Sequence, residues 1–178
     1  GRQVQYLDPD IITFQEIPLT NAGWTHMPEF VNAFRPGYHL ATNSGSDGFI
    51  RSVILSRHPI TRSTSWLDAA SLTNFGYDGK FTRDLFEAQI AVPGFPQPLH
   101  VFTVHLKSGQ GTDDSARRAA EASTVPTAAH FPALRNSDSR FLMSSSLKVV
   151  LGRILPMRPV RRWESTRIVG TGVNGDAR

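Results

Sequence analysis

The sequence contains no cysteine and no long run of apolar residues. The absence of cysteine excludes disulfide bonds and thiolate metal sites. No stretch approaches the roughly eighteen consecutive apolar residues typical of a membrane-spanning helix, so we expect no membrane span. A secretory signal pattern is also missing, and the first residue is Gly1 rather than methionine. This beginning indicates an excerpt of a longer protein.

Basic residues are concentrated in one part of the chain. The 178 residues include 19 Lys+Arg and 15 Asp+Glu, a formal net charge of +4. Residues 1–124 hold 10 of the basic and 12 of the acidic residues, whereas residues 125–178 hold 9 and 3. The second segment is also rich in arginine, serine and proline, with weak periodicity. Three interpretations stay open for it: frameshifted or divergent sequence, a basic appendage able to bind nucleic acid, or a disordered linker.

Two short apolar segments each end in ionisable residues. Residues 8–16 (DPDIITFQE) end at Glu16, and residues 99–109 (LHVFTVHLKSG) carry His105 at the end of their apolar run. β-Branched stretches of this length are typical of buried strands, which deliver side chains to the edge of a sheet. A carboxylate and an imidazole at two strand ends indicate an active site. The alternative is structural, with Glu16 paired to an arginine and His105 satisfied in the core.

Four segments resemble, in the same order, motifs of the endonuclease/exonuclease/phosphatase superfamily, the DNase I-like phosphoesterases. Residues 9–16 match its PDIIxxQE motif, and residues 105–108 match the HLKS end of its central strand. Residues 52–60 are similar to its AILSRxPI strand, and residues 81–88 to its arginine-bearing strand. The resemblance covers about residues 1–124. It implies an α/β (α+β) fold, a four-layer sandwich of two mostly antiparallel sheets flanked by helices, present only in part.

The resemblance also implies an activity and three site residues. The activity is metal-dependent phosphoester hydrolysis of the phosphodiesterase or nuclease type, with a phosphoester as substrate. Glu16 is expected to bind Mg²⁺ or Mn²⁺, since such hard cations take oxygen ligands. His105 is expected beside the scissile phosphate. Arg83 is expected to clamp a phosphate with its guanidinium, the alternative being a salt bridge to an acidic neighbour such as Glu87.

Other parts of the family's catalytic set are not found in the sequence. No strand ending in GDFN is recognisable after Pro126, and the family's first asparagine and last aspartate–histidine pair have no counterpart within residues 1–178. We therefore expect residues 1–124 to be a partial domain with little activity, followed by the basic tail of residues 125–178. DNA, nucleotides, inositol phosphates and sphingomyelin are all candidate substrates, because the superfamily hosts them on one scaffold. The alternative function is a non-catalytic fragment that binds nucleic acid or a protein partner.

The periodicity of apolar residues predicts the individual elements. Alternation and β-branched composition favour strands, while an apolar side repeated at helical spacing favours a helix. A turn of small polar residues is expected over residues 43–48, and Asp113 or Asp114 is expected to cap a helix. We expect strands over residues 10–16, 38–42, 49–56, 81–92 and 99–106, and helices within 21–34 and over 115–123.

Overall fold

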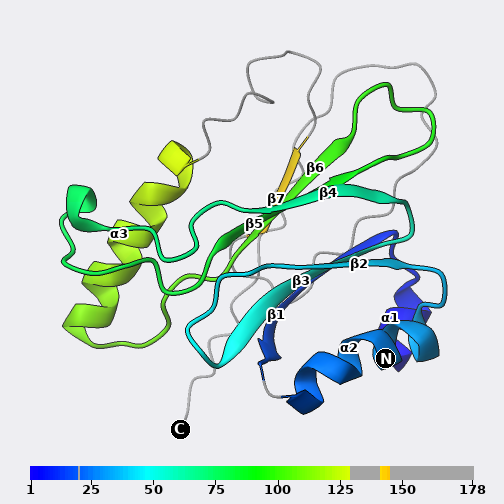
Figure 1. Cartoon of the computed structure of the whole chain (residues 1–178), viewed down its shortest axis with the longest axis horizontal. Coiled ribbons are helices and arrows are strands. Elements are labelled where there is room, and N and C mark those ends of the chain that lie inside the picture. The colour runs from blue at the N-terminus through cyan, green and yellow to red at the C-terminus, as the bar shows by residue number, and fades with distance from the viewer. Residues whose placement is uncertain (20, 129–140, 145–178) are drawn as a thin grey trace, which may run out of the picture.

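The computed structural model describes residues 1–19, 21–128 and 141–144. Within these ranges the chain alternates between short helices and strands (Figure 1). The elements in chain order are α1 (Arg2–Leu7), β1 (Ile11–Pro18), α2 (Asn21–Phe34), β2 (His39–Thr42), β3 (Ile50–Ser56), β4 (Ile60–Ser65), the 3-10 helix η1 (Thr73–Phe75), β5 (Leu85–Ile90), β6 (Leu99–Val104), α3 (Thr112–Ala128) and β7 (Phe141–Ser144).

The strands form two sheets. Sheet A has the order β1-β3-β2, and both of its pairings are antiparallel. Sheet B has the order β4-β5-β6-β7, in which only the pairing of β6 with β7 is parallel. The expectation of two mostly antiparallel sheets flanked by helices is therefore confirmed.

Three apolar clusters hold the sheets and helices together as four layers. The first lies between the sheets, where Ile11 and Ile54 of sheet A pack with Phe86 of sheet B. The second lies between sheet A and helices α1 and α2, and the third between sheet B and α3. Figure 1 shows α1 and α2 beside β1 to β3, with α3 on the side of sheet B. Full burial of a side chain such as Phe86 contributes about 1.5–3 kcal/mol.

The hairpin of β5 and β6 shows why these residues form strands with two buried faces. Phe86, Ala88 and Ile90 alternate along β5 and contribute to the cluster between the sheets. Leu85 points to the opposite face, toward the cluster that includes α3. This alternation is the regular one for side chains along a strand, and it gives β5 two buried faces.

Several elements differ from the sequence prediction. The final described helix, α3, begins at Thr112 and continues to Ala128, so Asp113 and Asp114 lie in its first turn rather than before it. Strand β4, helix η1 and strand β7 were not predicted. Strand β7 pairs with β6 by contacts that are distant in sequence, which local periodicity does not encode.

The predicted boundary after residue 124 falls inside α3. Part of the predicted tail is thus helical, and a further part forms β7. The division into a partial domain and a tail stays a prediction, since residues 129–140 and 145–178 lie outside the described residues. None of the helices in the described ranges is long and apolar enough to cross a membrane.

Candidate functional site

Glu16 occupies an irregular point of β1. The register of β1 with β3 shifts between Phe14 and Ile17, and Glu16 has a left-handed backbone with φ of 61°. A residue other than glycine in this region costs about 1–2 kcal/mol. Such bulges redirect a side chain, and backbone strain that the surroundings maintain is concentrated at functional sites. The Glu16 side chain is 48% exposed, so the bulge presents a carboxylate at the edge of the sheet.

His105 follows the last residue of β6 and faces this carboxylate. Its Nε2 lies 3.8 Å from Oε1 of Glu16, close enough for an ion pair but too long for a hydrogen bond. The His105 side chain is only 16% exposed, and its Nδ1 is buried without a hydrogen-bond partner among the described residues. Burial, and then the positive charge of Arg83, hold the pKa of His105 below its ordinary value, while Glu16 opposes this effect. The lowered pKa favours the neutral imidazole over the imidazolium.

Gln15 connects the two strands that carry Glu16 and His105. Its side-chain Nε2 donates a hydrogen bond to the carbonyl oxygen of Val104 at 2.7 Å, and it lies 3.4 Å from Oγ1 of Thr103. This contact joins β1 of sheet A to β6 of sheet B, one residue before each member of the pair. A buried hydrogen bond of this kind fixes the relative position of the strands, because loss of the donor would leave a buried carbonyl unsatisfied.

Arg83 lies between sheet B and the turn that follows β2. Its Nη1 donates a hydrogen bond to the carbonyl oxygen of Leu106 at 3.0 Å and lies 3.5 Å from that of His105. Its Nη2 forms an ion pair of 2.9 Å with Oδ2 of Asp47. The Arg83 side chain is 8% exposed, and its Nε is buried. The guanidinium thus faces two carbonyls and one carboxylate, and a role as a phosphate clamp stays a prediction.

Sequence reasoning missed Asp47. This residue lies in the turn between β2 and β3, and its Oδ1 accepts hydrogen bonds from the backbone N–H groups of Phe49 and Ile50. Burial would raise the pKa of Asp47, but these two donors and Arg83 together hold it below its ordinary value. The turn was predicted from its small polar residues. The partner of Asp47 was not predicted, because Arg83 is distant in sequence and lies in the segment that precedes β5.

Lys107 and Ser108 continue the HLKS segment, and Lys107 contacts residues of α3. Lys107 Nζ lies 2.9 Å from Oδ1 of Asp114 and donates to the carbonyl oxygen of Ser108 at 2.9 Å. The arrangement ties the segment after β6 to the first turn of α3.

The donor set suits a magnesium ion only in part. Within residues 1–19, 21–128 and 141–144 no three His, Asp or Glu side chains gather closely enough to hold a metal ion. Glu16 presents one carboxylate, whereas the nearby Asp47 carboxylate is engaged by Arg83 and by its own turn. Magnesium often keeps several waters and binds through one or two carboxylates together with substrate phosphates. Glu16 therefore fits as one protein ligand of such an ion.

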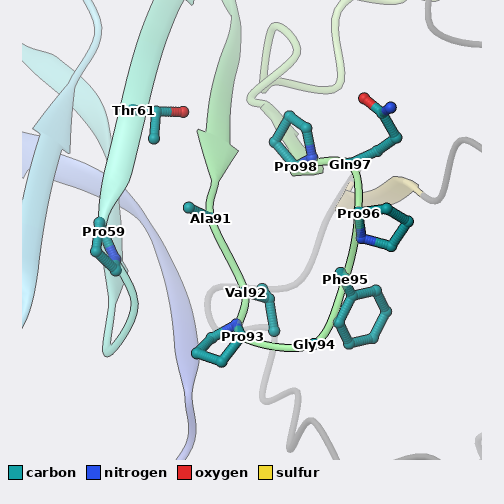
Figure 2. Close-up of a pocket in the computed structure, with 10 residues that line it drawn as sticks. All are labelled: Pro59, Thr61, Ala91, Val92, Pro93, Gly94, Phe95, Pro96, Gln97 and Pro98. Carbon is teal, nitrogen blue, oxygen red and sulfur yellow. The ribbon is translucent and has the colours of Figure 1, made fainter.

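A separate groove lies at the other end of the β5–β6 hairpin (Figure 2). It has a volume of about 540 Å³, and none of its lining residues is ionisable. It offers no acid or base that could activate the hydroxyl of Thr61, so it does not compete with the Glu16–His105 site as a centre for chemistry. Its lining comprises Pro59, Thr61 and residues 91–98.

Comparison with known proteins places this arrangement in a fold class. No protein family model matches the chain, and no curated protein matches it either. Among solved structures, it is similar to an endonuclease/exonuclease/phosphatase family protein from Leptotrichia buccalis C-1013-b, with a TM-score of 0.50 and 13% identity. The alignment covers 80% of this chain and 57% of that protein, so the chain spans little more than half of its length. At this identity the similarity establishes a shared fold.

Proposed function

We propose that the chain is part of a metal-dependent phosphoester hydrolase of the endonuclease/exonuclease/phosphatase superfamily, and that its phosphate is bound at the Glu16–His105 site. The main support is the approach of Glu16 and His105 to 3.8 Å from segments about ninety residues apart, with Glu16 held in a strained bulge. Strain at a position that presents a carboxylate is characteristic of functional sites. The shared fold is further support.

Glu16 is assigned the metal ion in this proposal. Its carboxylate would be one ligand of Mg²⁺ or Mn²⁺, with water and the substrate phosphate as the remaining ligands. When bound, such an ion supplies positive charge to the phosphate oxygens.

His105 is assigned the phosphate. A neutral imidazole donates one hydrogen bond, and Nε2 is the ring nitrogen that lies 3.8 Å from the half-exposed Glu16 carboxylate. A phosphate oxygen at this position would accept that hydrogen bond. Arg83 contributes its charge to the same region, and its hydrogen bonds hold the backbone at residues 105–106.

The chain as given is expected to turn over substrate slowly or not at all. The described residues provide one carboxylate for a metal and no cluster of three candidate ligands. Catalytic groups that act as a unit lose most of their effect when some are missing. We expect negligible hydrolysis of bis-p-nitrophenyl phosphate or plasmid DNA with Mg²⁺. Rapid metal-dependent turnover by the 178-residue chain would contradict this part of the proposal.

Binding of Mn²⁺ tests the assignment of the metal ligand without requiring turnover. Paramagnetic Mn²⁺ broadens NMR signals near its site, and we expect it to broaden the amide signals of Glu16 and His105 in the presence of phosphate. Glu16→Gln keeps the size of the side chain but removes its charge, so it should abolish the broadening. The matched control is Asp10→Asn, at the other end of β1, which should leave the broadening intact. Broadening that survives Glu16→Gln would refute the assignment.

A second function is favoured by the composition of residues 125–178. Their 9 basic and 3 acidic residues suit a segment that binds nucleic acid through phosphate contacts. In that case binding to DNA should weaken steeply with salt and should require the tail rather than Glu16. The DNA around codon 125 distinguishes the two functions: a strand ending in GDFN in another reading frame would identify the parent as an enzyme.

A further inference from the structure

The turn between β2 and β3 reaches from sheet A to the backbone of sheet B. Gly45 in this turn lies so close to Arg83 that an added Cβ would be 2.6 Å from the Arg83 carbonyl oxygen and 2.7 Å from Cβ of Asp84. Only glycine permits this approach without movement of one segment. Two residues later, Asp47 forms its ion pair with the Arg83 side chain. The turn therefore contacts both the main chain and the side chain of Arg83.

The two carboxylate oxygens of Asp47 have separate partners. Oδ1 accepts hydrogen bonds from the N–H groups of Phe49 at 3.0 Å and Ile50 at 3.1 Å, which fixes the turn. Oδ2 accepts from Nη2 of Arg83 at 2.9 Å. The Asp47 side chain is 19% exposed and that of Arg83 is 8% exposed, so water screens the pair only weakly. Asp47 thus fixes the position of Nη2 of Arg83 from the turn between β2 and β3.

The other terminal nitrogen of the guanidinium, Nη1, contacts the backbone of the segment that carries His105. Nη1 donates to the Leu106 carbonyl oxygen at 3.0 Å and lies 3.5 Å from that of His105. A planar guanidinium keeps the directions of its two Nη groups fixed relative to each other. A movement of Nη2 at Asp47 therefore also moves Nη1 relative to the carbonyl oxygens of residues 105–106.

We propose that Asp47 is a positioning residue of the phosphate site, acting through Arg83 on the main chain of His105 and Leu106. The inference rests on the proposed binding of phosphate at His105. Gln15 already fixes Val104 from β1 on one side of His105, and the Asp47–Arg83 pair fixes Leu106 on the other. The imidazole is thereby held between two anchored residues although its own Nδ1 has no hydrogen-bond partner among the described residues.

Asp47→Asn separates the two functions of the carboxylate. An asparagine retains a carbonyl oxygen that can accept the turn's N–H groups, but its NH₂ group cannot accept a hydrogen bond from Arg83. The turn should persist while the contact with the guanidinium is lost. The control is Asp78→Asn, which removes the same charge at an exposed position.

The experiment measures two properties of each variant by NMR at one fixed pH in the full 178-residue chain. The first is the carbonyl ¹³C shift of His105 and Leu106, which responds to hydrogen bonding. The second is the half-saturating concentration of inorganic phosphate for the imidazole signals of His105. In Asp47→Asn we expect both carbonyl signals to move and the phosphate concentration to rise about tenfold, the scale of a small misplacement of a positioned group. Asp78→Asn should match the unsubstituted chain in both.

Carbonyl signals that are unchanged in Asp47→Asn would overturn the inference, as would an unchanged phosphate affinity despite altered carbonyls. A different result identifies failure of the proposed function: if phosphate leaves His105 of the unsubstituted chain unperturbed, that function fails. The carbonyl signals then decide alone whether Asp47 positions residues 105–106. If Asp47→Asn does not fold, the Nη protons of Arg83 in the unsubstituted chain serve instead. Resolved, slowly exchanging protons support the inference, and averaged protons like those of exposed arginines overturn it.

Discussion

Clusters of charged residues lie at both ends of β1, and they differ in how closely their members are paired. At the beginning of the strand, Asp10 Oδ1 lies 2.8 Å from Arg57 Nε, and Asp8 lies within 3.0 Å of both Arg57 and Arg35. Tyr38 packs against both guanidinium groups and donates a hydrogen bond to a backbone carbonyl. The left-handed Asp8 is at a helix C-terminus, where that conformation is common. This cluster has the short, reciprocal contacts of a structural ion-pair network.

The other end of β1 differs in distance, backbone and exposure. Glu16 faces His105 at 3.8 Å rather than at hydrogen-bonding distance, and its left-handed backbone interrupts a strand. Both clusters combine acidic and basic groups, so charge alone does not separate a structural network from a candidate site. The separating features are a left-handed residue inside a strand and a contact too long for a hydrogen bond. Buried nitrogens without a hydrogen-bond partner among the described residues occur in both clusters, at Arg35 and at His105, and do not separate them.

The largest expected effect concerns the buried arginine at each end. Arg83→Met removes the guanidinium that pairs with Asp47 and satisfies the carbonyl of Leu106, and it should lower the free energy of unfolding by about 3 kcal/mol. Arg35→Met is the matched change at the structural end. Its partner Asp8 is 59% exposed, so the loss should be about 1 kcal/mol or less. Urea unfolding measures the free energy of unfolding of both variants. Equal losses would contradict the proposed difference between the two clusters.

A glycine substitution tests the strain at Glu16. Glu16→Gly removes the steric penalty of the left-handed backbone, partly offset by the entropy of glycine in the unfolded chain, so stability should rise by about 0.5–1 kcal/mol. In the same variant, Mn²⁺ should no longer broaden the amide signal of His105. Asp10→Gly, directly before β1, should instead lower stability because it removes a partner of Arg57. A destabilised Glu16→Gly chain would show that the bulge is not strained.

The smallest expected effect is on how the free energy of unfolding decreases at acidic pH. Burial acts to raise the pKa of Asp47, but its backbone donors and Arg83 prevail and lower it. A carboxylate with a lowered pKa in the folded state stabilises that state above its unfolded pKa. This contribution is lost as the pH falls below about 4 and through the lower folded pKa. Asp47→Asn should therefore lose less stability than the unsubstituted chain on acidification in this range. Urea unfolding at several pH values checks this, and an unchanged pH dependence would contradict it.

Sequence patterns predicted five of the strands better than they predicted the contacts between distant residues. Glu16 and His105 both follow apolar, β-branched runs. That local signal correctly placed His105 directly after β6, whereas β1 continues past Glu16 to Pro18. The alternative to a phosphate clamp at Arg83 was a salt bridge to an acidic neighbour such as Glu87, but the ion-pair partner in the structure is Asp47. Glu87 instead accepts hydrogen bonds from Trp66 and His100.

The features that were missed depend on contacts between the sheets. The Gln15 hydrogen bond to Val104, the bulge at Glu16 and the parallel strand β7 all require the assembled sandwich. Periodicity within a segment reports which face is buried, but it does not report which distant segment covers that face. For the same reason the length of α3 beyond its predicted end was not foreseen.

Phosphate binding by the unsubstituted chain tests the central claim most directly. The chain offers two histidines for comparison, His105 beside Glu16 and His100, whose Nδ1 is bonded to Glu87 at 2.5 Å. Imidazole signals of both can be followed by NMR during a titration with inorganic phosphate in the presence of Mg²⁺. We predict a saturable shift of the His105 signals and none for His100. A titration that shifts His100 and leaves His105 unchanged, or that shifts neither, would contradict a phosphate site at Glu16 and His105.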